Sequence, residues 1–164
     1  MSKEHFYKAK IRWTGNLGAG TSEYTAYSRN HEISGEGGKD KILASADPIY
    51  RGEASRYNPE ELVVAAIAGC HMLWYLHLCA DAGVVVVDYE DEPVGTLTEF
   101  DDGNGKFAEA VICPRVTITK DSDAEKAMEL HEKAHEFCFI ANSMNFPVRF
   151  EPTIIFETEK AAVK

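Results

Sequence analysis

The chain lacks an excess of basic residues, and this absence bears first on its function. Its 164 residues include 17 Lys and Arg against 27 Asp and Glu, which gives a formal net charge of −10. A chain with this charge is repelled by a phosphate backbone, so we expect no nucleic-acid partner. Lys8, Lys10 and Arg12 alternate with apolar residues, which is typical of the solvated face of an early strand.

A secretory leader is also missing from the pattern of the first residues. The segment MSKEHFYKAK has no apolar core and no small-residue cleavage site. The chain has only four cysteines, and no export signal accompanies them. We therefore expect reduced thiols in a cytoplasmic protein and not a disulfide framework.

Long apolar runs are scarce, and the longest one raises the question of a membrane. Residues 62–80 approach the length of a membrane span, but His71 and His77 interrupt them and carboxylates bracket both ends. A helix that is apolar on all sides also suits the buried centre of a soluble assembly. We favour the buried helix and expect no membrane partner.

The residues that flank this run predict a central helix over residues 58–82. Asn58 is a good N-cap, and Glu61 stands where a capping-box carboxylate belongs. Pro59 suits the first helical position, and Gly83 is a natural C-terminal stop. The helix is thus bounded at both ends by local signals.

The rest of the chain alternates between strand-like and helical patterns. The turn sequence DDGNG at residues 101–105 indicates a hairpin. Ser122 and Glu125 form a capping box that predicts a second helix through Cys138. Strand-like segments occupy residues 7–13, 24–34, 40–46, 84–100, 106–119 and 153–157.

This order of elements indicates an α+β fold with antiparallel strands around a long buried central helix. We expect a single domain over residues 1–164, with N-terminal strands in 1–57 and the central helix in 58–82. The hairpin, second helix and last strand then occupy residues 83–160. Small residues on the central helix allow a second copy to pack closely, so we expect a homodimer: Ala65, Ala66, Ala68 and Gly69.

Among the cysteines, Cys70 and Cys138 stand out because both are predicted to point inward from different helices. Gly69 before Cys70 weakens the helix by roughly 1 kcal/mol relative to alanine. A reactive thiolate in mid-helix needs a separate cation or hydrogen-bond donor. The pattern leaves open whether the two thiols form a functional pair or are inert core residues. Cys79 and Cys113 are interpreted as small hydrophobes.

The stretch NPEELVVAAIAGCH at residues 58–71, together with AHEFCFIAN at residues 134–142, resembles the OsmC/Ohr family of osmotically inducible and organic hydroperoxide resistance proteins. The order and spacing of the segments agree over most of the chain. The resemblance implies an OsmC-like fold and an intertwined homodimer. It also implies a thiol-dependent peroxidase in oxidative stress defence, which reduces organic hydroperoxides, uses an external dithiol and needs no cofactor.

The resemblance also implies roles for individual residues. Cys70 corresponds to the peroxidatic thiol, Cys138 to the resolving thiol, and Glu60 to the glutamate of the NPE motif. Glu60 and Cys70 are ten residues apart on one helix, roughly 15 Å along its axis, so a partner subunit or a folded-back segment has to bring them together. Glu60 alternatively serves only the helix macrodipole.

The active-site arginine of the family has three candidates in this chain. Arg29 lies about as far upstream of the cysteine as the arginine of the Ohr branch, and we choose it. Arg56 and Arg51 both lie closer to where the OsmC branch supplies its arginine, and Arg56 is the second choice. An ordinary surface role is the alternative for each.

Two other functions stay open. Cys70, His71, His135 and Cys138 offer a Cys₂His₂ metal site, but adjacent helical residues point about 100° apart. His131 and His135, in a charged stretch, are expected to be solvated. Phe139 and His71 depart from the Ohr pattern, which leaves room for a catalytically diverged binding or stress protein. In the peroxidase reading, apolar walls favour alkyl or lipid hydroperoxides: Leu73, Trp74, Phe137 and Phe139.

Overall fold

The computed structural model describes residues 3–158. Contacts along the chain divide it into two compact units, residues 1–62 and 63–164. The expectation of one domain over residues 1–164 stays a prediction. Each unit has its own sheet structure, and the long helix α1 (Pro59–Ala82) contains the boundary between them.

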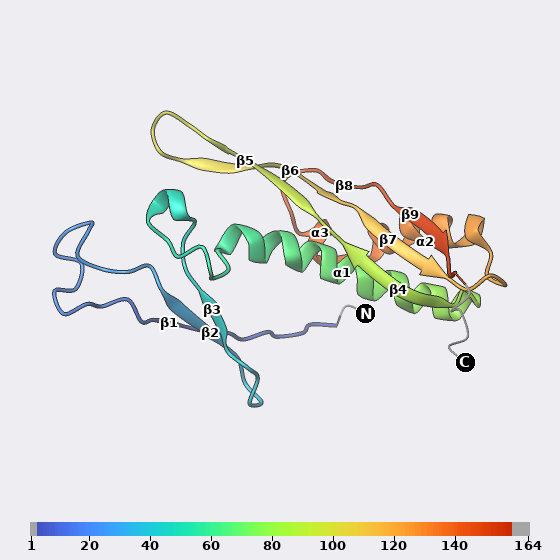
Figure 1. The fold of residues 1–164 in the computed structure, drawn as a ribbon, viewed down its shortest axis with the longest axis horizontal. Coiled ribbons are helices and arrows are strands. Elements are labelled where there is room, and N and C mark those ends of the chain that lie inside the picture. Colours follow the sequence, from blue (N-terminus) through green and yellow to red (C-terminus); the bar gives the residue numbers. More distant parts are fainter. Residues whose placement is uncertain (1–2, 159–164) are drawn as a thin grey trace. The chain divides into compact units, whose positions relative to one another are not determined.

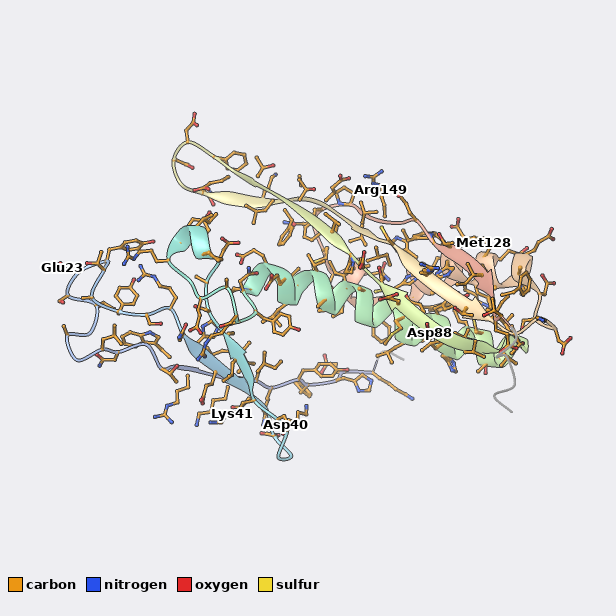
Figure 2. The ribbon with its side chains drawn as sticks, viewed as in Figure 1. Glu23, Asp40, Lys41, Asp88, Met128 and Arg149 are labelled. Atoms are coloured by element: carbon orange, nitrogen blue, oxygen red, sulfur yellow. The ribbon has the colours of Figure 1, made fainter. Side chains whose placement is uncertain are left out.

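Unit 1 contains one antiparallel sheet in the order β1-β2-β3. An ion pair between Lys41 and Glu32, with 2.7 Å between nitrogen and oxygen, ties the start of β3 to β2, and Lys41 is labelled in Figure 2. A short 3-10 helix follows the sheet. The elements of unit 1 are β1 (Lys10–Trp13), β2 (His31–Ser34), β3 (Ile42–Ala44) and η1 (Pro48–Tyr50).

Two predictions for unit 1 were wrong. The strand predicted at residues 7–13 starts only at Lys10, and its apolar face is not buried in the single chain, since Ile11 is 62% exposed. Of the strand predicted at 24–34, only the last four residues form a strand, although Tyr27 makes an isolated antiparallel bridge with Asn16. The Arg29 guanidinium donates hydrogen bonds to the carbonyl oxygens of Tyr24 and Tyr27. These two oxygens are therefore not available to a neighbouring strand.

The central helix α1 (Pro59–Ala82) begins and ends as predicted. The Asn58 backbone N–H donates to the Glu61 carboxylate at 3.0 Å, and the Glu61 N–H donates to the Asn58 side chain at 2.8 Å. Gly83 has a positive φ of 76°, which suits a glycine at a helix C-terminus. The capping box and the stop signal are thus confirmed.

The burial of α1 follows one stripe of the helix. Its buried residues recur mainly at four-residue spacing and are Ile67, Ala68, His71, Tyr75 and Cys79. Within residues 3–158, α1 is the one helix long and apolar enough to cross a membrane by length and composition. A core helix of a soluble protein passes the same test, and the buried stripe favours that interpretation.

Unit 2 contains two three-stranded sheets, in the orders β4-β7-β9 and β5-β6-β8 (Figure 1). The pairs β4–β7 and β5–β6 are antiparallel, whereas β7–β9 and β6–β8 are parallel. The predicted hairpin is confirmed in β5–β6. The strands are β4 (Val86–Asp91), β5 (Val94–Glu99), β6 (Gly105–Ile112), β7 (Pro114–Ile118), β8 (Val148–Phe150) and β9 (Thr153–Phe156).

The two long strands predicted at 84–100 and 106–119 are each broken in the middle. Pro93, in the first break, has no backbone N–H to continue a ladder. Cys113, in the second break, donates its backbone N–H to the Asp91 carboxylate at 2.7 Å instead of to a strand. Because of these breaks, the first predicted strand becomes β4 and β5 and the second becomes β6 and β7. One half of each belongs to each sheet. The sequence pattern also missed β8.

The second predicted helix is α2 (Ala124–Phe137), followed by a short α3 (Phe139–Asn142). Its N-cap is Asp123, which accepts the backbone N–H of Lys126 at 3.0 Å, so the predicted capping box of Ser122 and Glu125 was wrong. The Ser122 hydroxyl instead accepts the N–H of Val85 at 2.9 Å. Because Val85 occupies the Ser122 hydroxyl, Asp123 caps the helix, and α2 starts one residue later than predicted.

The apolar core of unit 2 forms where α1, β7 and α2 meet. Tyr75 and Cys79 of α1 pack with Val116 and Ile118 of β7 and with a face of α2 that includes Ala134. A second cluster joins the earlier part of α1 to β6 through Ile67, Ala68, Ala110 and Ile112. Because α1 belongs to both clusters, its position relative to α2 is determined by the core.

Candidate functional site

Cys70 and Cys138 lie near each other in unit 2. The Cys70 thiol lies close enough to contribute to the raised pKa of Cys138. The Cys138 sulfur also lies 3.9 Å from the carbonyl oxygen of Ile67, which precedes Cys70 by three residues on α1. Both cysteines are free thiols. The fold thus brings together two thiols that are 68 positions apart in the sequence (138 minus 70).

The two thiols differ in their access to solvent. Cys70 is half-buried, whereas Cys138 is fully buried. Burial, with the Cys70 thiol as a further cause, raises the pKa of Cys138 to about 11, although the backbone N–H of Ala141 opposes this by donating to its sulfur at 3.4 Å. Cys138 is therefore protonated at neutral pH, and Cys70 is the thiol that a dissolved molecule reaches.

The position of Cys138 depends on a break between two helices. The helix predicted through Cys138 ends one residue earlier, and Cys138 adopts an extended conformation with φ −69° and ψ 101°. Its carbonyl accepts the N–H of Asn142, and its sulfur accepts that of Ala141, so it caps α3. The Asn142 amide donates back to the Glu136 carbonyl at 2.8 Å, which holds the turn closed.

The helices α1 and α2 approach each other in an antiparallel register that explains the meeting of the thiols. At one level the Tyr75 hydroxyl donates to the Ala127 carbonyl at 3.1 Å. Further back along α1 and further forward along α2, the ring nitrogens of His71 and His131 lie 3.0 Å apart. Further in the same direction, the carbonyl oxygen of Ile67 on α1 lies 3.9 Å from the Cys138 sulfur.

Aromatic side chains that are exposed or half-buried lie near the thiols. The Trp74 ring stacks on Phe137 with centroids 5.1 Å apart and meets Phe139 edge-on at 5.6 Å. Trp74 follows Cys70 by one helical turn, and Phe137 and Phe139 stand on either side of Cys138. Phe139 is 65% exposed, so this group forms an apolar surface open to solvent. It contains three of the four residues predicted to line the site.

A buried imidazole pair, not predicted from the sequence, lies beside the thiols. His131 was expected to be solvated but is fully buried, like His71. Burial lowers the pKa of His71 to about 4 and that of His131 to about 3, so both rings are neutral at pH 7. The available signal was spacing, because His131 falls one helical turn after Ala127 and thus on the apolar face of α2.

The four side chains of the Cys₂His₂ alternative do not gather as a metal-ligand group within residues 3–158. In the part of the chain that the structure describes, no group of three or more His, Cys, Asp or Glu side chains could hold a metal ion. The Nε2 atom of His71 faces His131 instead of joining Cys70. This geometry agrees with the divergence expected for adjacent helical residues.

The arginine candidates and Glu60 belong to unit 1, and their part in the site stays a prediction. The guanidinium of Arg29 donates to two backbone carbonyls and lies 4.2 Å from the ring centroids of both Tyr24 and Tyr27. Arg56 donates to the Glu53 carboxylate at 3.1 Å. Glu60 is half-buried in the first turn of α1.

Arg51 is the remaining candidate. It caps η1 in a left-handed conformation with φ 66°, which is uncommon for a residue with a side chain. Its backbone N–H donates to the carbonyl of Pro48 at 3.0 Å. Arg51 thus has a structural part in the turn after η1.

Comparison with known proteins supports the relationship that the motifs suggested. A family model described as OsmC-like protein matches residues 52–153, which is more than half of the chain and includes both thiols. The chain is 33% identical over 108 residues to the organic hydroperoxide resistance protein OhrB of Bacillus subtilis (strain 168), and this match covers 66% of the chain and 76% of OhrB.

Solved structures share the fold. An OsmC-like protein of unknown function from Vibrio cholerae O1 biovar eltor has a TM-score of 0.82 at 31% identity, over 92% of this chain and 100% of the other. The crystal structure of B. subtilis OhrB has a TM-score of 0.61 at 24% identity, over 91% and 98%. The predicted α+β fold is confirmed, and the chain belongs to the OsmC-like family.

Proposed function

We propose that the protein is a thiol-dependent peroxidase that reduces organic hydroperoxides through Cys70 and Cys138. The observation that carries this proposal is the nearness of a partly exposed thiol to a buried one. A relative at 33% identity is named as an organic hydroperoxide resistance protein, which supports the choice of substrate. The cellular role that follows is oxidative stress defence in the cytoplasm.

The first step oxidises Cys70. Its thiolate attacks the outer oxygen of the hydroperoxide, so an S–O bond forms while the O–O bond breaks. The alkoxide takes up a proton and leaves as an alcohol, and Cys70 becomes a sulfenic acid. From the family resemblance, Arg29 stabilises the thiolate and Glu60 helps to form the active site. Arg56 is the second choice for the cation.

The second step joins the two sulfurs. The Cys138 sulfur attacks the sulfenic acid, so the S–S bond forms while the S–O bond breaks. Because its pKa is raised to about 11, Cys138 arrives protonated, and its proton leaves with the hydroxyl as water. An external dithiol then reduces the disulfide by exchange and is itself oxidised to a disulfide.

The surroundings of the thiols favour an apolar substrate. Trp74, Phe137 and Phe139 form one aromatic group in which both phenylalanines are exposed, and Leu73 nearby on α1 is 65% exposed. Burying apolar surface contributes about 25 cal/mol per Å², so an alkyl chain gains binding energy here that hydrogen peroxide does not. Alkyl or lipid hydroperoxides are therefore the proposed substrates.

The working form is proposed to be a homodimer. Ala65 and Ala66 of α1 are exposed in the single chain, and a Cβ built on Gly69 meets no atom of the described residues within 4 Å apart from the adjoining helix backbone. A second copy of the chain fits this surface of small residues. Analytical ultracentrifugation tests the proposal directly, and a stable monomer at micromolar concentration contradicts it.

Mass spectrometry after one equivalent of cumene hydroperoxide tests the peroxidase. We expect a new disulfide between Cys70 and Cys138, no such bond in Cys70→Ser, and sulfenic acid followed by over-oxidation in Cys138→Ser. Cys113→Ser is the matched control and retains the disulfide. Full turnover by Cys70→Ser contradicts the mechanism. No turnover on any hydroperoxide, with both thiols free, favours the alternative of a diverged binding or stress protein.

A further inference from the structure

We propose that the hydrogen bond between His71 and His131 positions Cys70 and Cys138 for reaction with each other. This inference rests on the proposed function in taking the thiol pair as the reactive centre. It assigns the two histidines a role outside the chemical steps, since no step of the proposed reaction uses an imidazole. They act on the reaction through the helices that carry the sulfurs.

The two rings are each other's hydrogen-bonding partners. The Nε2 atom of His71 and the Nδ1 atom of His131 lie 3.0 Å apart, with ring planes 5° from parallel. Among residues 3–158, the outer nitrogens, Nδ1 of His71 and Nε2 of His131, are buried and have no hydrogen-bond partner. Since a neutral imidazole has one N–H and one lone pair, one ring donates and the other accepts. This hydrogen bond is therefore the polar interaction that joins the side chains of His71 and His131.

Along the contact between α1 and α2, the His71–His131 pair lies between the two thiols and the hydrogen bond from Tyr75 to Ala127. His71 directly follows Cys70 on α1, and His131 precedes Cys138 by seven residues, about 10 Å along a helix. On the far side the next polar contact joins Tyr75 to Ala127. Of these two side-chain hydrogen bonds between α1 and α2, the imidazole pair is nearer to the sulfurs in sequence.

A directional bond suits this task better than apolar packing. Forming a disulfide requires Cα atoms roughly 4.4–6.8 Å apart with a defined dihedral angle. Apolar contacts depend mainly on buried area and permit small sliding movements of packed helices. A hydrogen bond weakens steeply when its geometry changes, so it opposes such sliding. Displacements of about 1 Å can cost two orders of magnitude in a reaction rate.

The rings are also held against rotation. The Tyr75 ring stacks on His131 with centroids 3.8 Å apart, and the Phe150 ring lies 5.9 Å from that of His71. Both imidazoles are buried and neutral at pH 7, so the bond is not screened or exchanged with water. The constraint therefore passes from one helix backbone to the other through two side chains with little freedom.

The thiol–disulfide equilibrium with glutathione, measured without any hydroperoxide, tests the role of the pair. This equilibrium gives the effective concentration that the Cys138 thiol presents to Cys70. The effective concentration depends on the relative position of the two thiols. Asn and Leu have similar size, and both remove the stacking on Tyr75, but only Asn presents a polar atom near the position of Nδ1. We expect His131→Leu to lower the effective concentration about tenfold or more, and His131→Asn to stay within about threefold of the wild type.

A second variant guards against misfolding. His131→Leu leaves the Nε2 atom of His71 unpartnered, which destabilises the core, whereas His71→Leu with His131→Leu removes both polar partners. Circular dichroism checks the fold of each protein. We expect the double variant to have the same low effective concentration as His131→Leu. Wild-type values in both proteins overturn the inference, as does an equal fall in His131→Asn and His131→Leu.

The outcome is distinguishable from a failure of the proposed function. A protein that forms the disulfide with glutathione but turns over no hydroperoxide contradicts the peroxidase and leaves the equilibrium readout intact. A wild-type protein that forms no disulfide between Cys70 and Cys138 at any glutathione ratio overturns the positioning role itself.

Discussion

The phenol ring of Tyr75 stacks on the imidazole of His131, with centroids 3.8 Å apart, while its hydroxyl donates to the Ala127 carbonyl at 3.1 Å. One side chain of α1 thus makes both an aromatic and a polar contact with α2. Burial raises the pKa of Tyr75 well above its usual value, so the hydroxyl stays protonated and keeps donating. This contact anchors the antiparallel register that places the thiols.

Replacing Tyr75 by phenylalanine separates the two parts of this contact. Tyr75→Phe retains the stacking and loses the hydrogen bond, so we expect the free energy of unfolding to fall by about 1 kcal/mol. Urea denaturation followed by circular dichroism measures it. Tyr7→Phe is the control, because Tyr7 is 89% exposed and its change should stay within about 0.5 kcal/mol. Equal effects of the two changes contradict the prediction.

The buried imidazole pair makes the protein sensitive to acid. The pKa values in the folded state, about 4 for His71 and about 3 for His131, lie below the ordinary 6.5. Below pH 6.5 the unfolded chain therefore binds more protons than the folded one. The stability contributed by the neutral pair is complete above pH 6.5 and is lost as the pH falls toward 4 and then 3.

Each histidine is expected to cost about 1.4 kcal/mol of unfolding free energy per pH unit inside this window. Urea denaturation at several pH values between 7.5 and 4.5 measures the slope. The double variant His71→Leu with His131→Leu retains the other titrating groups, including Asp91, whose pKa burial raises. We expect its slope to be much flatter. The same slope in both proteins would falsify the assignment.

The start of α2 offers a test of the corrected N-cap. Asp123→Ala removes the acceptor of the Lys126 backbone N–H, so we expect a loss of about 1 kcal/mol in unfolding free energy. Glu125→Gln probes the capping box that the sequence pattern predicted, and it should change the stability by a few tenths of a kcal/mol at most. A larger loss in Glu125→Gln than in Asp123→Ala restores the original assignment.

Trp74 is expected to contribute to the preference for apolar hydroperoxides. Trp74→Leu removes an indole that stacks on Phe137, which takes away about 1–2 kcal/mol of apolar contact with a bound alkyl group. We therefore expect kcat/KM for cumene hydroperoxide to fall roughly tenfold. Steady-state kinetics with hydrogen peroxide is the internal comparison and should change little. An equal fall for both peroxides indicates damage to the thiols and not a loss of binding.

Local signals in the sequence predicted the helix ends and the hairpin. Asn58, Glu61 and Gly83 bound α1 as expected because each acts on backbone groups within four residues of itself. The turn sequence at residues 101–105 joins β5 to β6 for the same reason. The family resemblance at residues 58–71 and 134–142 was confirmed by a family model that covers both stretches.

Signals that compete with tertiary contacts were interpreted wrongly. Ser122 has the right spacing for an N-cap, but its hydroxyl is taken by Val85. Cys113 lies within a strand pattern, but its N–H is taken by Asp91. His131 lies among charged residues, but the face of α2 that carries it is covered by α1. In each case the deciding partner is 20 or more residues away, beyond the reach of a local pattern.

The amino-acid order by itself determined which thiols were worth considering, because motif spacing and apolar periodicity are properties of neighbouring residues. Whether those thiols meet depended on the antiparallel approach of α1 and α2, which contacts between distant segments impose. The difference between the two sulfurs arose in the same way. Burial by other elements raises the pKa of Cys138, and burial is a property of the packed chain alone.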